Sequence, residues 1–114
     1  MDATWKAKWV AALRSGEYKQ GRGRLRSEDD EYCCLGVLCE IAAQVGVIER
    51  AAPPPNTSSV AWRYGGWHDY LPMSLADVVR LDTYNPTIED VQLTNMNDEG
   101  KSFLEIADLI EKHL

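Results

Sequence analysis

The sequence predicts a single small α+β domain that is mostly helical, with a central buried helix, a capped C-terminal helix and short extended segments. Its 114 residues provide for one domain, and no internal repeat divides residues 1–114. Hydrophobic residues make up 45% and charged residues 26% of the chain, which is typical of a folded domain. Apolar residues also recur at helical spacing near both ends of the chain.

The first helix is expected at about residues 5–15. Its apolar face consists of residues four positions apart, Trp5, Trp9 and Leu13. Thr4 is placed to cap its N-terminus, and Gly16 to end it in a left-handed turn. Residues 18–26 then predict a short extended segment, in which two glycines indicate a bulge or a close backbone approach.

The most hydrophobic stretch, residues 32–46, is the predicted central helix. Apolar residues lie almost all round it, which is typical of a buried helix. Gly36 is expected to mark a close helix crossing, and Gly46 to end the helix. A buried strand at 33–39 is the alternative, because the period of a short apolar run does not separate the two.

The remaining chain alternates between loops and short elements. Residues 51–59 predict a proline-stiffened loop, and residues 60–71 two short strands joined by a turn at Gly65 and Gly66. A capping box predicts a helix from 74 to 81, and residues 82–91 are expected to be irregular. The two boxes are Ser74 with Asp77, and Ser102 with Glu105 before a last helix whose stripe is Phe103, Ile106, Ala107, Ile110 and Leu114.

Charge is distributed unevenly along the chain. Residues 1–26 carry seven basic and two acidic side chains, whereas residues 27–114 carry five basic and sixteen acidic ones. The net charge of −6 argues against general nucleic-acid binding, which needs a broad cationic surface. One local anion site in the basic segment remains compatible with it. The plain alternative is that the basic segment pairs with the acidic remainder.

The chain is expected to act in the cytoplasm. No apolar run approaches the ~18 residues that cross a bilayer, so no membrane partner is expected. The segment from Met1 to Lys6 has no apolar core after a basic start and is not a signal peptide. The three cysteines are therefore expected to be reduced thiols.

The cysteines predict packing rather than metal binding, and no cofactor is expected. On a helix, Cys33 and Cys34 each lie well over a quarter turn from Cys39, so the three would not converge on one ion. Cysteine packs in protein cores like a small hydrophobic residue. A metal ligand set and a reactive thiol are the alternatives.

A candidate ligand site lies in the extended segment. Arg22, Arg24 and Arg26 would point to one face at period two, beside glycines that let a ligand approach the backbone. Three guanidiniums in a row suit a phosphate or pyrophosphate. The alternative is a solvated edge strand that uses charge to prevent aggregation.

Aromatic residues supply the other half of this candidate site. Tyr64, Trp67 and Tyr70 are expected to reach the surface beside His68, where they could stack on a nucleobase or bind a protein. The remaining tryptophans, Trp5, Trp9 and Trp62, are expected to pack in the core.

Catalysis has weaker support. His68 with Asp69 is the plausible base, and Cys34 or Ser74 would be the nucleophile by default. No nucleophile-elbow signature is present. A carboxylate pair drawn from Asp69, Asp82, Glu89 and Asp90 is the other option.

The segment Tyr32–Glu40, with the sequence YCCLGVLCE, resembles a family of small uncharacterised bacteriophage proteins. The resemblance extends over most of the chain, including Trp9–Gly16, Tyr70–Pro72 and Glu105–Glu111. It implies no activity and no catalytic residues. It does imply a context, since small accessory phage proteins often bind a host component or counter host defence.

Three functions follow as hypotheses. The first is a binding protein that sequesters a small anionic nucleotide-type ligand of host defence. The second is a protein–protein inhibitor that docks on a host protein through exposed Trp or Tyr residues. The third is an enzyme that degrades such a nucleotide. A homodimer is compatible with so dense an apolar helix in a small domain.

Overall fold

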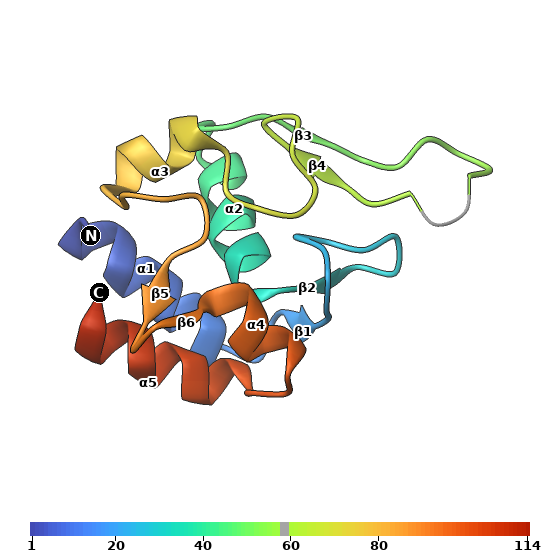
Figure 1. Ribbon diagram of the computed structural model, residues 1–114. Helices are drawn as coiled ribbons and strands as arrows, with labels where there is room; N and C mark the ends of the chain where they lie inside the picture. Colours follow the sequence, from blue (N-terminus) through green and yellow to red (C-terminus); the bar gives the residue numbers. More distant parts are fainter. Residues whose placement is uncertain (58–59) are drawn as a thin grey trace.

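The structure, a computed structural model, describes residues 1–57 and 60–114. Within these residues the chain forms five helices, with one of them at the centre (Figure 1). They are α1 (Ala3–Arg14), α2 (Cys34–Gln44), α3 (Met73–Val79), α4 (Leu93–Asp98) and α5 (Phe103–His113). The predicted α+β domain, mostly helical with a central buried helix, is confirmed.

The strands are short, and each pairs with one other strand to form a small two-stranded sheet. Over the described ranges they are β1 (Lys19–Gln20) parallel to β2 (Glu31–Tyr32), β3 (Arg50–Ala51) antiparallel to β4 (Arg63–Tyr64), and β5 (Thr87–Ile88) antiparallel to β6 (Val91–Gln92). The register places Arg50 opposite Tyr64. Each of these strands is only two residues long, so the helices rather than the strands build the core.

Helix α2 is the centre of the core, which excludes the alternative strand at 33–39. Nearly all of its side chains are buried, and it packs on α1 and α4. A Cβ on Gly36 would lie 1.7 Å from the carbonyl oxygen of Leu25. The expected helix crossing at Gly36 is therefore wrong, since the backbone that approaches it belongs to the loop after β1.

Helix α1 begins earlier than expected. The side chain of Asp2 accepts the Trp5 amide at 2.9 Å and caps the helix, so the expected cap at Thr4 is wrong. Gly16 has a φ of +76°, which confirms the left-handed turn. The indole of Trp9 is fully buried and donates to the carbonyl oxygen of Cys34 at 2.9 Å, which ties α1 to the first turn of α2.

The segment 18–26 is not extended throughout. Only β1 is a strand, and the chain then bends through Gly23, whose φ is +77°. Period-two alternation needs continuous extended backbone. The expectation that three arginines share one face of this segment is therefore wrong.

The turn at Gly65 and Gly66 is confirmed, with φ of +55° and +86°. Across it, Tyr64 and Trp67 form a single antiparallel bridge rather than two paired strands, and the strand partner of β4 is β3, which comes before the proline-rich loop. Part of the loop predicted over 51–59 is strand β3, and positions 58–59 lie outside the described residues.

The expected capping box at Ser74 is wrong, because α3 begins at Met73 and has no side-chain cap. The expectation of an irregular segment at 82–91 is also wrong in part. Hairpin β5–β6 turns at Glu89 and Asp90, both at positive φ, and α4 follows without a gap.

Helix α5 matches its prediction closely. Ser102 and Glu105 form the capping box, with the hydroxyl of Ser102 accepting the Glu105 amide at 3.2 Å. The predicted stripe is buried from Phe103 to Ile110 and half-buried at Leu114. Helices α1 and α5 lie side by side below α2 (Figure 1).

Candidate functional site

Arg26 is committed to an ion pair inside the protein. Its guanidinium lies 3.5 Å from a carboxylate oxygen of Glu40 and 2.9 Å from Asp30, and its side chain is 13% exposed. The guanidinium also lies 3.5 Å from the ring centroid of Trp62, a cation–π contact. Arg26 is therefore a structural residue in this fold, and its charge is already matched.

Glu40 is the buried centre of this cluster. Its carboxylate accepts hydrogen bonds from the Tyr64 hydroxyl at 2.9 Å, from Gln44 at 2.8 Å and from Arg50. Burial acts to raise the pKa of Glu40, but these hydrogen bonds outweigh it and hold the pKa below its ordinary value. Glu40 is thus ionised and paired.

Tyr64 does not reach the surface, contrary to expectation. Its side chain is fully buried, and burial raises the pKa of its phenol well above the ordinary value. Tyr64 can be buried because its hydroxyl donates to Glu40 and accepts from Arg26 at 3.4 Å. Burial of the whole ring therefore leaves no unpaired polar group.

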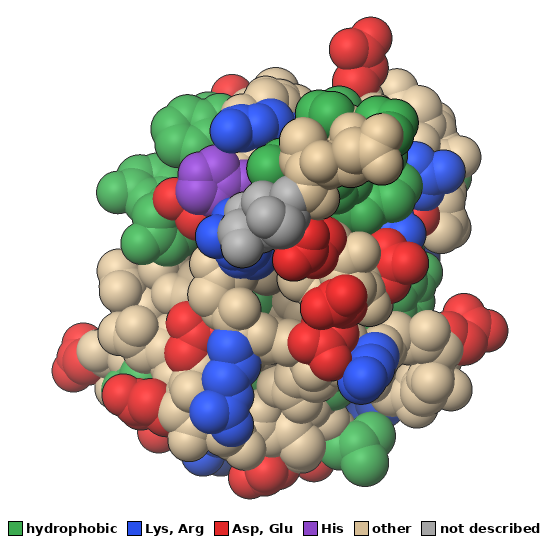
Figure 2. All heavy atoms as spheres, turned by 90° about the vertical axis from the view of Figure 1, so that its right-hand side faces the viewer, with side chains coloured by type: hydrophobic (Ala, Val, Ile, Leu, Met, Phe, Trp, Pro, Cys, Tyr) green, Lys and Arg blue, Asp and Glu red, His purple; other side chains and the backbone are tan. Residues whose placement is uncertain are grey.

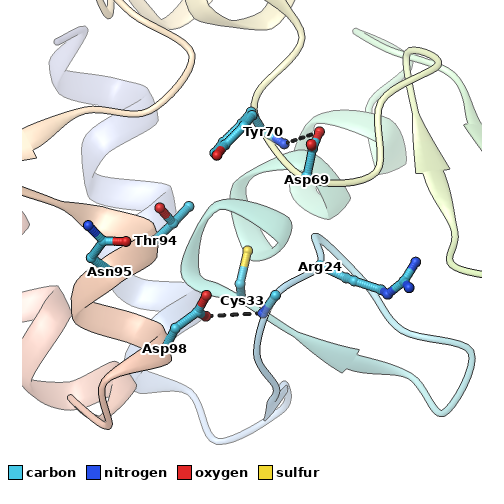
Figure 3. Close-up of a pocket in the computed structure, with 8 residues that line it drawn as sticks. Arg24, Cys33, Asp69, Tyr70, Thr94, Asn95 and Asp98 are labelled. Atoms are coloured by element: carbon cyan, nitrogen blue, oxygen red, sulfur yellow. Dashed lines mark hydrogen bonds between the residues drawn. The ribbon is translucent and has the colours of Figure 1, made fainter.

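The three candidate arginines do not gather. Arg22 and Arg24 are exposed, Arg26 is turned inward, and the Arg24 side chain is directed away from the Cys33 thiol in Figure 3. Figure 2 shows Lys and Arg side chains interleaved with Asp and Glu on one face of the molecule. The basic segment does pair with the acidic remainder, through Arg14 with Asp108 and Glu111, Lys19 with Glu31, and Arg26.

Four large side chains between residues 67 and 84 are exposed or half-exposed, and we call them together the aromatic face: Trp67, Tyr70, Met73 and Tyr84. Trp67 and Tyr84 are each 49% exposed and Met73 is 46% exposed. The rings of Tyr70 and Tyr84 lie 5.2 Å apart. The amide of Leu71 donates to the Tyr84 carbonyl at 3.0 Å, which holds the two segments together.

His68 lies between this face and the loop of residues 21–26, which we call the arginine loop. Its carbonyl oxygen accepts the Leu25 amide at 2.8 Å, which places Arg24 beside the 67–70 segment. Its buried Nδ1 atom has no hydrogen-bond partner among the described residues. Arg24 therefore lies near the 67–70 segment, whereas the side chains of Arg26 and Tyr64 are turned inward to Glu40.

A cavity of about 120 Å³ opens beside the aromatic face (Figure 3). Residues from four separated segments line it: Gly23, Arg24, Cys33, Asp69, Tyr70, Thr94, Asn95 and Asp98. One oxygen of Asp98 accepts the Gly23 amide at 3.0 Å and the Asn97 amide group at 3.2 Å. The other has no hydrogen-bond partner in the described parts of the chain.

The thiol at the floor of this cavity is not a nucleophile. Cys33 is 2% exposed, and burial raises its pKa to about 12. Burial likewise raises the pKa of Cys34 and of Cys39. The prediction that the cysteines pack in the core is confirmed, and no cluster of His, Cys, Asp or Glu in residues 1–57 and 60–114 could hold a metal ion.

Asn97 sets the position of α4 against this cavity, and the sequence carried no signal for it. Its side-chain oxygen accepts the Cys34 amide at 3.2 Å and the Gln20 side chain at 2.9 Å. Its nitrogen donates to the carbonyl of Gly21 at 2.7 Å. The buried amide therefore binds α4 to both α2 and the arginine loop, with Thr94, Asn95 and Asp98 facing the cavity.

Most of the catalytic candidates lie outside the lining of this cavity. Cys34 is fully buried, which leaves it inaccessible to a substrate. Of the four candidate carboxylates only Asp69 lines the cavity, whereas Glu89 lies at the hairpin turn, 3.5 Å from His113. The arrangement supplies a polar recess beside exposed aromatic side chains, which suits binding.

Comparison with known proteins identifies one family. The model of a domain of unknown function, DUF8296, matches residues 1–114. No curated protein and no solved structure matches the chain. Along the described part of the chain, every helix is too short or too polar to cross a bilayer.

Proposed function

The chain belongs to DUF8296, a family defined without a function, and we propose from its site that it is a binding protein that docks on another protein through the aromatic face. The observation that carries this proposal is the exposure of Trp67 and Tyr84, together with the ring contact between Tyr84 and Tyr70, which lines a polar cavity. Exposed Trp and Tyr at the centre of an interface supply most of its binding energy.

The partner is a protein with a basic surface. The chain has a net charge of −6, and four of its cationic side chains, Arg14, Lys19, Arg26 and Arg50, are paired with its own carboxylates. Complementary charge raises the association rate and excludes acidic partners. The resemblance to phage accessory proteins makes this partner a host protein, met in the cytoplasm where the three thiols stay reduced.

Sequestration of an anionic nucleotide has less support from the geometry. Two residues of that hypothesis, Arg26 and Tyr64, are bound to Glu40. The cavity itself contains two carboxylates, Asp69 and Asp98, which repel phosphate. The nucleotide hypothesis now depends on Arg22 and Arg24.

Affinity capture with matched variants tests the proposal. Immobilised protein in a bacterial lysate should retain one protein in stoichiometric amount, and Trp67→Ala should release it. Leu104→Ala removes an equally exposed side chain from α5, outside the aromatic face, and should retain the partner. Retention by both variants would overturn docking through the aromatic face. A nucleotide-dependent rise in melting temperature that Arg22→Ala and Arg24→Ala abolish would favour the nucleotide hypothesis instead.

A further inference from the structure

Resting on the proposed docking function, we propose that the cavity between Tyr70, Cys33 and Asp98 receives an arginine side chain of the partner protein. The cavity is the natural recess of the proposed interface, because Tyr70 belongs both to its wall and to the aromatic face. A side chain that enters it is surrounded by the contacts that exclude water from the interface. Charged anchors contribute most in such desolvated central positions.

The charge of the cavity selects a cation. Asp98 offers a carboxylate oxygen without a partner among the described residues, and Asp69 lies on the same rim. The lining includes one basic side chain, Arg24, which Figure 3 shows directed away from the Cys33 thiol. Asp98 therefore dominates the interior, and a positively charged group enters favourably.

Size and shape favour guanidinium over other cations. A volume of about 120 Å³ is well above the ~10–15 Å³ that one water needs, so the cavity has room for the planar head of an arginine side chain. Tyr70 supplies an aromatic ring on which a planar guanidinium can stack. The oxygens of Thr94 and Asn95 stand beside Asp98 on α4 and can accept its remaining N–H groups.

Titration of the full chain with N-acetyl-arginine amide tests this assignment without a partner. Backbone amide signals in ¹⁵N-labelled protein should shift saturably at Gly23, Tyr70 and Asp98, with a dissociation constant on the order of millimolar. N-acetyl-citrulline amide has nearly the same shape without the charge and should leave these signals in place. Asp98→Asn should weaken arginine binding about tenfold while the asparagine oxygen still accepts the Gly23 amide.

Two further variants keep the test decisive. If Asp98→Asn lowers the melting temperature, Asp69→Asn replaces it as the test variant. Asp69→Asn should weaken arginine binding severalfold. Asp77→Asn changes an exposed acid on α3 outside the cavity and should bind as the unmodified chain does. Absence of a saturable shift, equal shifts with citrulline, or binding unchanged in both cavity variants would overturn the assignment. Because capture of the partner is measured separately, a negative titration leaves the docking proposal standing.

Discussion

The guanidinium of Arg26 lies 3.5 Å from the carboxylate of Glu40, and this buried pair joins the loop after β1 to the central helix. Trp62 stacks on the same guanidinium, and Tyr64 donates to the same carboxylate. The pair therefore holds the segment before the aromatic face against α2. Arg26, which the sequence indicates as a ligand-binding residue, is instead a structural residue that supports the proposed binding surface.

Removing the charge of Glu40 should destabilise the fold. Glu40→Gln removes the buried counter-ion that Arg26 and Arg50 share and leaves Arg26 with Asp30 alone, and loss of one partner of a buried pair costs about 3 kcal/mol. Urea unfolding followed by tryptophan fluorescence measures the change. The matched control is Glu111→Gln, because Glu111 pairs with Arg14 at the surface and its loss should cost less than about 1 kcal/mol. Equal effects of the two variants would show that the buried pair is not a stabilising contact.

Stability should fall in acid, partly through Glu40. The pKa of Glu40 lies below its ordinary value of 4.5 in the folded state, so the unfolded chain takes up this proton first. The stabilisation is complete above pH 4.5 and is lost as pH falls through the folded pKa. The pKa of Glu105 is also lowered, by its hydrogen bonds with Ser102. Melting temperature measured against pH should therefore show a shallower acid slope in Glu40→Gln than in the unmodified chain, and an unchanged slope would contradict this role.

Gly36 should not tolerate a side chain. The Cβ of alanine would lie 1.7 Å from the Leu25 carbonyl oxygen, and a backbone carbonyl cannot move away as a flexible side chain can. Gly36→Ala should cost more than about 3 kcal/mol and displace the arginine loop. A Cβ on Gly16 would meet no atom within 4 Å, so Gly16→Ala should lower the free energy of unfolding only through the strain of a φ of +76°, by about 1 kcal/mol. Chemical denaturation of the two variants gives the comparison, and a tolerated Gly36→Ala would mean that the loop does not press on α2.

Part of this fold could be predicted from local signals. Helix α5 carries its own capping box and apolar stripe, and α2 carries a long apolar run, so both are encoded within a few residues. Helix α4 is six residues long and depends on Asn97, whose partners lie 63 to 77 positions away in sequence. Such a contact leaves no periodic pattern along the chain.

Part of the candidate site could likewise be predicted from local sequence, and part depends on contacts distant in sequence. Trp67, His68 and Tyr70 are neighbours in sequence, and the structure keeps them together beside Arg24. The burial of Arg26 and Tyr64 could not be predicted, because Glu40, which satisfies both, belongs to another segment. The cavity residues on α4 were missed for the same reason.

The cysteines should be unreactive in the folded protein. All three are buried, and a pKa of about 12 leaves almost no Cys33 thiolate at neutral pH. Modification by a thiol-specific disulfide reagent should be slow in native buffer and should reach three thiols per chain in denaturant. Rapid native reaction of one thiol would identify Cys33 as accessible through the cavity.

The most direct test of the docking claim is calorimetric titration of the captured partner, once purified, with the unmodified chain and its Trp67→Ala variant. Loss of a central aromatic anchor should weaken binding about thirtyfold, which corresponds to about 2 kcal/mol, and the Leu104→Ala control should bind with unchanged affinity. Equal affinity of Trp67→Ala and the unmodified chain would contradict docking through the aromatic face.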